Sequence, residues 1–278
     1  MEVVSTIDAL RARLEGERKI AFVPTMGNLH EGHLTLMKLA RQHAPCVVAS
    51  IFVNRLQFGP TEDFAQYPRT LEEDCAKLKS CKVDIAFTPD ENVLYPVPQR
   101  VMVDLPPVAN ELCGKFRPGH FRGVATVVLK LFNIVQPQTA VFGKKDYQQL
   151  FIIRELVREL NLPIEIISAE TARDANGLAL SSRNSYLSAA ERLEAARLYQ
   201  TLVYIKEQIE SGERDFGELQ EKAEKKLDSH GWRVDYVAVR KSLTMEPAQA
   251  TDKALVVLGA AWLGKIRLID NLEVFITK

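Results

Sequence analysis

Short apolar runs rich in β-branched residues alternate with amphipathic segments through roughly the first 170 residues, and this alternation most constrains the fold. The runs have strand length and no polar face, as expected for strands buried on both sides of a parallel sheet. The predicted strands are 20–25, 46–53, 83–88, 101–105, 139–143 and 164–169, and the predicted helices are 34–42, 71–80, 124–135 and 147–160. Residues 1–183 are therefore predicted to form a doubly wound parallel α/β domain.

The pattern changes after Asn184. Ser188 and Glu191 have the spacing of a capping box at the start of a long helical stretch, and a second, charged helix is predicted at 216–229. Short apolar runs follow, and the strands predicted from them are 234–239, 255–258 and 266–270. This mixture indicates a smaller α+β domain over residues 184–278.

Charge and cysteine content exclude several classes of protein. Lys plus Arg and Asp plus Glu both total 36, so the chain has no net positive field to hold a nucleic acid. No apolar run approaches membrane-spanning length, and residues 1–14 lack the apolar stretch of a signal peptide. The four cysteines form no CxxC pair and are interpreted as idle thiols. We expect a cytoplasmic protein with no nucleic-acid or membrane partner.

Residues 24–33, PTMGNLHEGH, lead from a predicted strand into a predicted helix. A helix N-terminus offers unpaired N–H groups and a positive dipole end to an anion, and Gly27 allows close approach. His30 and His33 lie three residues apart, on one helix face, where both can donate to the same phosphate chain. Asn28 and Glu31 are expected to cap the helix. Because both GxGxxG and the P-loop pattern are absent, HxGH indicates nucleotidyl transfer.

Two further polar segments follow predicted strands. Asn54 and Gln57 come just after the strand 46–53, at the edge where open α/β sheets bind ligands, although a plain turn explains them equally well. In residues 143–149, GKKDYQQ, a lysine can neutralise phosphate charge. Asp146 is either a helix cap or a group that positions Mg²⁺ or the lysine.

A fourth segment, Leu180 to Asn184, places two serines beside Arg183 at the predicted domain boundary. Hydroxyl groups and a guanidinium form a compact set of donors for phosphate oxygens. Together with HxGH, this SSRN segment resembles the second signature motif of class I aminoacyl-tRNA synthetases and related nucleotidyltransferases.

The order HxGH, NxxQ, GxKDxxQ and SSRN, with residues 112–123, LCGKFRPGHFRG, closely resembles the pantoate–β-alanine ligase (pantothenate synthetase) family along essentially the whole chain. The resemblance implies a Rossmann-like domain of the HxGH nucleotidyltransferase type. It also implies ATP-dependent condensation of pantoate with β-alanine through a pantoyl-adenylate, with release of pyrophosphate and then AMP. Further implications are a requirement for Mg²⁺, a homodimer, and a C-terminal domain that acts as a lid.

Site residues are carried over from the family by motif. The catalytic set is expected to be His30, His33, Lys145, Ser182 and Arg183, with His33 at the family's proton-donor position. ATP contacts are expected from Pro24, Thr25, Met26, Gly27, Asn28, Leu29, His30, Glu31, Gly32, His33, Gly143, Lys144, Lys145, Asp146, Ala172, Leu180, Ser181, Ser182 and Arg183. Pantoate and β-alanine are expected to contact Asn54, Gln57 and Gln149. Mg²⁺ is expected to bind mainly through the ATP phosphates, with Asp146 as a candidate ligand.

Some points stay open at this stage. Lys144 stands where the family commonly has an acidic residue, and Ala172 where valine is expected. His120 and Arg122 belong either to the path by which pantoate enters or to the dimer contact. The alternatives to this function are another adenylyltransferase, including one that charges an RNA, and a nucleotide-binding regulatory protein without catalysis.

Overall fold

The computed structural model describes residues 1–60 and 62–276, and their contacts divide the chain into two compact units. Unit 1 comprises Met1–Gly143 and Ile152–Glu170, and unit 2 comprises Lys144–Phe151 and Thr171–Lys278. This division differs from the predicted one, because residues 144–151 and 171–183 group with the C-terminal part of the chain. The division into domains of residues 1–183 and 184–278 stays a prediction from the sequence.

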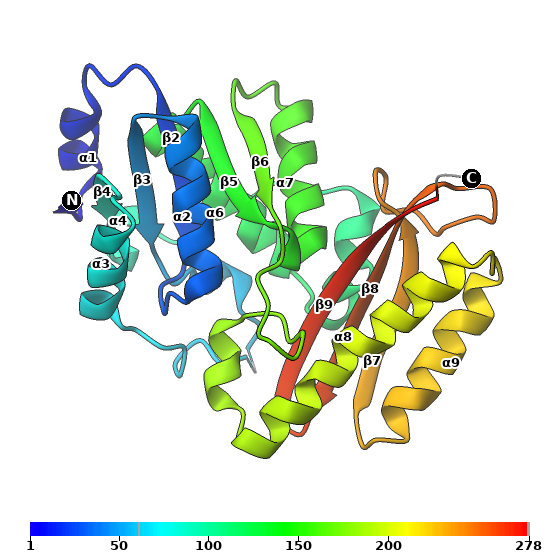
Figure 1. The fold of residues 1–278 in the computed structure, drawn as a ribbon. Coiled ribbons are helices and arrows are strands. Elements are labelled where there is room, and N and C mark those ends of the chain that lie inside the picture. The colour runs from blue at the N-terminus through cyan, green and yellow to red at the C-terminus, as the bar shows by residue number, and fades with distance from the viewer. Residues whose placement is uncertain (61, 277–278) are drawn as a thin grey trace. The chain divides into compact units, whose positions relative to one another are not determined.

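Unit 1 is built on a six-stranded sheet in the order β1-β4-β3-β2-β5-β6, with every neighbouring pair parallel (Figure 1). Its strands are β1 (Glu2–Val4), β2 (Ile20–Thr25), β3 (Cys46–Ile51), β4 (Ile85–Phe87), β5 (Thr139–Gly143) and β6 (Glu165–Ala169). The doubly wound parallel sheet is thus confirmed. Five of the six strands match predicted runs, and β2 and β5 match them at both ends.

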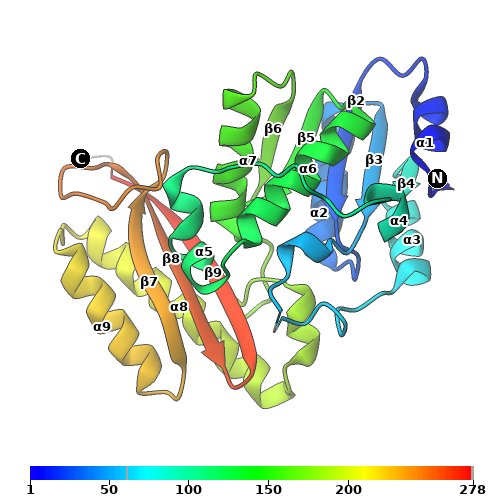
Figure 2. The same ribbon diagram turned by 180° about the vertical axis from the view of Figure 1, so that it is seen from behind.

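Helices cover both faces of this sheet. Figure 1 shows α2 (Glu31–His43) in front of the strands, and the reverse view in Figure 2 shows α6 (His120–Val135) on the opposite face. The remaining α-helices before β6 are α1 (Ile7–Leu14), α3 (Leu71–Ser80), α4 (Glu91–Leu94), α5 (Cys113–Phe116) and α7 (Tyr147–Glu159), of which α7 begins in unit 2 and continues in unit 1. Short 3₁₀ turns are η1 (Arg55–Gln57), η2 (Pro107–Asn110) and η3 (Lys144–Asp146).

One predicted strand is wrong, and one real strand was missed. Residues 101–105 form no strand, and Val101 is 80% exposed, because prolines flank this segment on both sides. The edge strand β1 pairs only with β4 and has just one buried residue, Val4, so it lacks the continuous apolar run of the central strands.

The order in which strands are added to the sheet reverses, and this switch point lies between β2 and β5. From β2 the chain adds β3 and β4 on one side, and it then returns to place β5 on the other side of β2. The β2–β5 ladder contains only the pairs Ala21–Thr139 and Phe22–Ala140, whereas β2 pairs with β3 over all six of its residues. Beyond these pairs β2 and β5 are no longer paired toward their carboxyl ends. Doubly wound sheets bind ligands at such a switch point.

Unit 2 contains an antiparallel sheet in the order β7-β8-β9, with two helices on one face (Figures 1 and 2). Its elements are η4 (Ser182–Tyr186), α8 (Ala189–Glu210), α9 (Phe216–Asp228), β7 (Arg233–Lys241), β8 (Ala254–Leu263) and β9 (Ile266–Phe275). Buried residues of both helices and all three strands form one apolar core. The predicted capping box is confirmed, since Ser188 and Glu191 bond reciprocally at 2.8 and 3.3 Å. No helix among the described residues is both long and apolar enough to cross a bilayer.

Candidate active site

The HxGH turn begins where β2 ends, and its first residues are fixed by the neighbouring strand. The hydroxyl of Thr25 donates to the carbonyl of Ser50 at 2.7 Å and accepts from the backbone N–H of Gly27 at 3.3 Å. Gly27 has a φ of +81°, and a Cβ atom there would lie 3.0 Å from Asp74 Oδ2 and 3.1 Å from Ile51 Cγ2. Both the backbone angle and the crowding therefore require glycine at this position.

A buried carboxylate from α3 holds the next two residues of the turn. Asp74 is 0% exposed, and it accepts from the N–H groups of Asn28 at 2.9 Å and Leu29 at 2.7 Å. The Thr70 hydroxyl donates to the same carboxylate at 3.1 Å, and Lys77 Nζ donates to the Leu29 carbonyl at 2.8 Å. These two N–H groups are therefore committed to Asp74, so any phosphate contact at this turn must come from other donors. Sequence analysis did not single out Asp74.

Helix α2 starts at Glu31, with His30 as its N-cap residue, so the predicted capping by Asn28 is wrong. The backbone N–H of His30 donates to Nδ1 of His33 at 3.3 Å, and the two rings lie 4.1 Å apart. Because Nδ1 accepts, a neutral His33 ring carries its proton on Nε2. The first N–H groups of any helix have no acceptor within the helix, and here these belong to Glu31 and Gly32. This end of α2 can present both N–H groups and an imidazole donor to a phosphate.

Asn54 is a buried residue whose amide organises the turn after β3. Its Nδ2 donates to Gln57 Oε1 at 3.0 Å and to the Gly123 carbonyl at 3.2 Å. Its Oδ1 accepts from the Tyr95 hydroxyl at 2.8 Å and from the N–H of Leu56 at 3.3 Å. Burial is the main cause that raises the pKa of Tyr95, so its hydroxyl stays protonated and remains a donor. The structure gives Asn54 a role in holding Gln57, and its contact with substrate stays a prediction.

Gln57 links this turn to the HxGH turn. Its Nε2 lies 3.1 Å from Met26 Sδ, and its backbone carbonyl lies 2.9 Å from Nδ1 of His120. The other ring nitrogen of His120 lies 3.0 Å from Arg117, whose guanidinium binds Glu62 through two bonds of 2.8 and 2.6 Å. Unit 1 therefore brings the first two predicted motifs into contact.

His120 and Arg122, whose roles the sequence left open, have different surroundings. His120 is buried at 9% exposure and contacts the Gln57 carbonyl, whereas Arg122 is exposed. An arginine can only donate, so the His120 nitrogen beside Arg117 acts as the acceptor, and Nδ1 carries the proton toward Gln57. His120 thus holds the backbone carbonyl of Gln57, a residue that is predicted to bind substrate.

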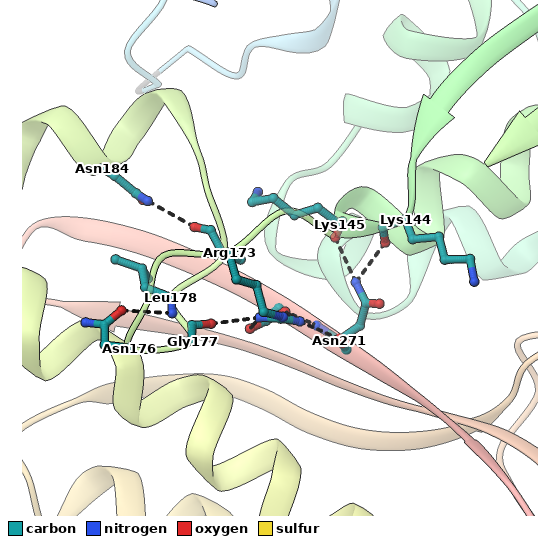
Figure 3. A network of polar contacts seen from close by, with 10 residues as sticks. Lys144, Lys145, Arg173, Asn176, Gly177, Leu178, Asn184 and Asn271 are labelled. Carbon is teal, nitrogen blue, oxygen red and sulfur yellow. Dashed lines mark hydrogen bonds and ion pairs between the residues drawn. The ribbon is translucent and has the colours of Figure 1, made fainter. Parts of the chain in front are cut away.

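In unit 2 the lysine turn η3 directly continues from β5, and its two lysines point in opposite directions (Figure 3). Lys144 Nζ forms an ion pair with Glu273 of β9 at 2.6 Å. No described residue forms a hydrogen bond or ion pair with the ammonium group of Lys145. Asn271 Nδ2 donates to the backbone carbonyls of both lysines at 2.9 Å. Lys145 is therefore the lysine that can neutralise a ligand's charge, while Lys144 is held within the protein.

The first turn of α7 is also tied to β9. The Tyr147 hydroxyl donates to Glu273 Oε1 at 3.0 Å and lies 3.3 Å from the Ser242 carbonyl. Asp146, just before this turn, is exposed, and Gln149 is half-buried. The position of Gln149 in the first turn of a well-anchored helix suits a residue that holds a substrate, and its contact with pantoate stays a prediction.

A hairpin over residues 172–180 supports the SSRN segment (Figure 3). Arg173 binds Asp270 through two bonds of 2.6 and 2.9 Å, donates to the Gly177 carbonyl at 3.0 Å, and lies over the Tyr199 ring at 4.1 Å. Burial raises the pKa of Asp270, and the Arg173 guanidinium opposes that rise. A Cβ atom at Gly177 would lie 2.3 Å from the Tyr199 ring, so the hairpin packs tightly on α8.

The SSRN segment follows this hairpin directly. The N–H of Leu180 donates to the Ala172 carbonyl at 2.9 Å, which closes the hairpin. Ser181 caps η4, and its hydroxyl accepts from the backbone N–H two residues later at 3.3 Å. Asn184 is buried, and its Nδ2 donates to a hairpin carbonyl at 3.0 Å. Ser182 and Arg183 thus begin a 3₁₀ turn whose flanking residues, Ser181 and Asn184, are both held by hydrogen bonds.

Comparison with known proteins identifies the family. The family model described as pantoate-beta-alanine ligase matches residues 2–273. The chain belongs to the pantoate–β-alanine ligase family. A relative named pantothenate synthetase from Nitrosospira multiformis is 65% identical to this family member over 274 residues, covering 99% of this chain and 98% of the relative.

Solved structures agree with this assignment. A pantothenate synthetase from Thermus thermophilus superposes on this ligase with a TM-score of 0.94 at 45% identity, covering 99% and 100% of the two chains. A pantoate-beta-alanine ligase from Francisella tularensis, solved in complex with Beta-gamma ATP and Beta-alanine, superposes with a TM-score of 0.83 at 35% identity and covers 98% and 97%.

Proposed function

We propose that this chain condenses pantoate with β-alanine at the expense of ATP. Formation of a pantoyl-adenylate releases pyrophosphate from ATP, and attack of β-alanine on that adenylate then releases AMP. Family membership over residues 2–273 is the observation that carries this proposal. The HxGH turn at the switch point of the sheet supports it, because the turn combines helix N–H groups with two adjacent imidazoles.

In the first step a carboxylate oxygen of pantoate attacks the α-phosphorus of ATP, and the bond from that phosphorus to pyrophosphate breaks. Positioning and neutralisation of charge supply most of the catalysis in such a transfer. We assign this role to His30, His33, Lys145, Ser182 and Arg183. The Nδ1 contact of His33 supports its part, since the neutral ring keeps Nε2–H as a donor for a phosphate oxygen. Among the described residues none forms a hydrogen bond or ion pair with the Lys145 ammonium, whereas Lys144 is paired with Glu273, and this supports the choice of Lys145.

Pantoate is held in this proposal by Gln57 and Gln149, which offer neutral amides for a hydroxy acid. Gln57 is suited to this because its side chain and carbonyl are both fixed, by Asn54 and Met26 on one side and His120 on the other. A preorganised amide loses little conformational entropy when it binds substrate.

We propose that Mg²⁺ binds together with ATP, mainly through its phosphates. Within residues 1–60 and 62–276, no group of three or more His, Cys, Asp or Glu side chains is arranged to hold a metal ion. The donor set thus fits an ion carried by the triphosphate, because Mg²⁺ keeps several waters and takes one or two carboxylates plus phosphate oxygens. The exposed carboxylate of Asp146 is the candidate protein ligand. Bound Mg²⁺ would supply neutralisation of phosphate charge.

In the second step the uncharged amine of β-alanine attacks the acyl carbon of the adenylate. The bond from that carbon to the AMP oxygen breaks, and the new amide nitrogen loses a proton. AMP is a good leaving group, so the main requirements are alignment of the amine and exclusion of water. We further propose that the enzyme works as a homodimer in the cytoplasm, which sedimentation of the purified protein and cell fractionation would check.

The deciding experiment measures AMP release from purified protein with Mg·ATP and pantoate, with and without β-alanine. AMP formation that requires both acids supports the ligase. Pyrophosphate release with a different acid or nucleotide would instead identify another adenylyltransferase. A protein that binds ATP without any turnover would be a regulatory relative.

A further inference from the structure

Asn271 stands at a position where strand β9 meets the lysine turn (Figure 3). Its side-chain nitrogen carries two hydrogens, and it donates to two successive backbone carbonyls, those of Lys144 and Lys145, at 2.9 Å each. The residue is 5% exposed. Among side chains of this size, only asparagine offers an NH₂ group in this place, since an aspartate would direct acceptor oxygens at two acceptor carbonyls.

The backbone of Asn271 is itself fixed. It lies opposite Leu258 in the β8–β9 ladder, its N–H donates to Asp270 Oδ1 at 2.7 Å, and its carbonyl accepts from Arg173 at 3.3 Å. Asp270 in turn holds Arg173 through two bonds. The amide that contacts the lysine turn therefore extends from a rigid strand.

The two ammonium groups of the lysine turn differ in their contacts. Lys144 is bound to Glu273, two residues beyond Asn271, whereas Lys145 extends in the opposite direction, and its ammonium has no hydrogen-bond or ion-pair partner among the described residues (Figure 3). The two carbonyls belong to the peptide groups on either side of the Lys145 Cα atom. Holding both of them fixes the direction in which the Lys145 side chain leaves the backbone.

We infer that Asn271 is a positioning residue, whose side-chain amide aims Lys145 at the phosphates of ATP. This inference rests on the role of Lys145 in the proposed function. A displacement of about 1 Å in a group that contacts the transition state can reduce the rate about a hundredfold. Asn271 would therefore influence catalysis although it contacts no substrate itself.

A double-mutant cycle between Asn271→Ala and Lys145→Ala tests the inference, with AMP release measured at varied ATP. Removing Lys145 should lower kcat/KM for ATP by about a hundredfold to a thousandfold, as for a lost charge-stabilising donor. Asn271→Ala alone should lower it by about tenfold or more. If Asn271 acts through Lys145, adding Asn271→Ala to Lys145→Ala should change the rate by less than about twofold.

Two further variants separate positioning from general stability. Asn271→Asp keeps the shape of the side chain and should lose as much activity as Asn271→Ala, and it replaces that variant in the cycle if Asn271→Ala does not fold. Glu273→Gln, on the same strand, weakens the pair with Lys144, and its effect should multiply with that of Lys145→Ala.

The outcomes are distinct. Independent, multiplicative effects of Asn271→Ala and Lys145→Ala overturn the positioning role while leaving Lys145 in the proposed site. Near-normal turnover by Lys145→Ala removes that lysine from the proposed function itself, and the positioning role with it. Loss in Asn271→Ala that appears only as a lower melting temperature, with kcat/KM unchanged for the folded enzyme, also overturns the inference.

Discussion

Replacing Asp74 should weaken the HxGH turn more than any other single change to a residue that contacts no ligand. The carboxylate is fully buried and accepts from two backbone N–H groups and one hydroxyl. In Asp74→Ala the buried N–H of Leu29 and the part-buried N–H of Asn28 lose their acceptor, at about 1–3 kcal/mol each. The expected loss in the free energy of unfolding is therefore about 4 kcal/mol.

Asp74→Asn should lose less. One amide oxygen still accepts from a backbone N–H, but the NH₂ group faces the other N–H, so about 1–3 kcal/mol is lost at a single donor. Each kcal/mol lowers the melting temperature of a unit of this size by about 2–4 °C. We expect the transition of unit 1 to fall by about 10 °C in Asp74→Ala and by about 5 °C in Asp74→Asn.

Differential scanning calorimetry of the purified protein measures these shifts. Glu72→Gln is the matched control, because Glu72 lies on the same helix but is exposed, and its change should stay within about 0.5 kcal/mol. The KM for ATP should rise in both Asp74 variants, since the turn loses its support. An Asp74→Ala protein that melts within about 2 °C of the wild type would refute this account of the turn.

Two other substitutions and one labelling experiment have clear expected outcomes. Gly123→Ala places a Cβ atom 2.1 Å from the Leu56 carbonyl, so the turn carrying Gln57 must shift, and steady-state kinetics should show KM for pantoate raised about tenfold. Gly177→Ala adds a side chain at a φ of +93° and 2.3 Å from Tyr199, and urea unfolding should show a loss of about 3 kcal/mol. Burial raises the pKa of Cys46 to about 11, so at pH 8 only about one thiol in a thousand is ionised, and mass spectrometry should find Cys46 unmodified after brief iodoacetamide treatment of the native protein.

The fold was largely predictable because its central strands are short apolar runs between turn signals. β2 and β5 are buried on both faces, so their sequences allow few other interpretations. The segment 101–105 is equally apolar in composition but forms no strand, because prolines flank it and Val101 lies exposed. Composition alone does not distinguish these cases.

The supporting residues of the site were much harder to predict than its motifs. HxGH and SSRN have recognisable chemistry at fixed spacing, whereas Asp74 resembles any acidic residue in the first turn of a helix. The backbone N–H groups that it holds lie 45 and 46 residues away in the sequence, and the carbonyls that the Asn271 side chain contacts lie more than a hundred residues away. Such pairings follow from the tertiary fold, so no local pattern marks them.

The contacts of β9 have a consequence for attempts to divide this protein. Unit 2 is not one stretch of sequence, because residues 144–151 complete it from within the N-terminal part of the chain. A fragment that begins near residue 184 would expose the side chains of Asn271 and Glu273 without the lysine turn that they bind. Such a fragment would also leave the Tyr147 hydroxyl on the other piece. Splitting the chain near residue 184 would therefore produce two incomplete pieces. When the two pieces are mixed, we expect either both of them to fold or neither.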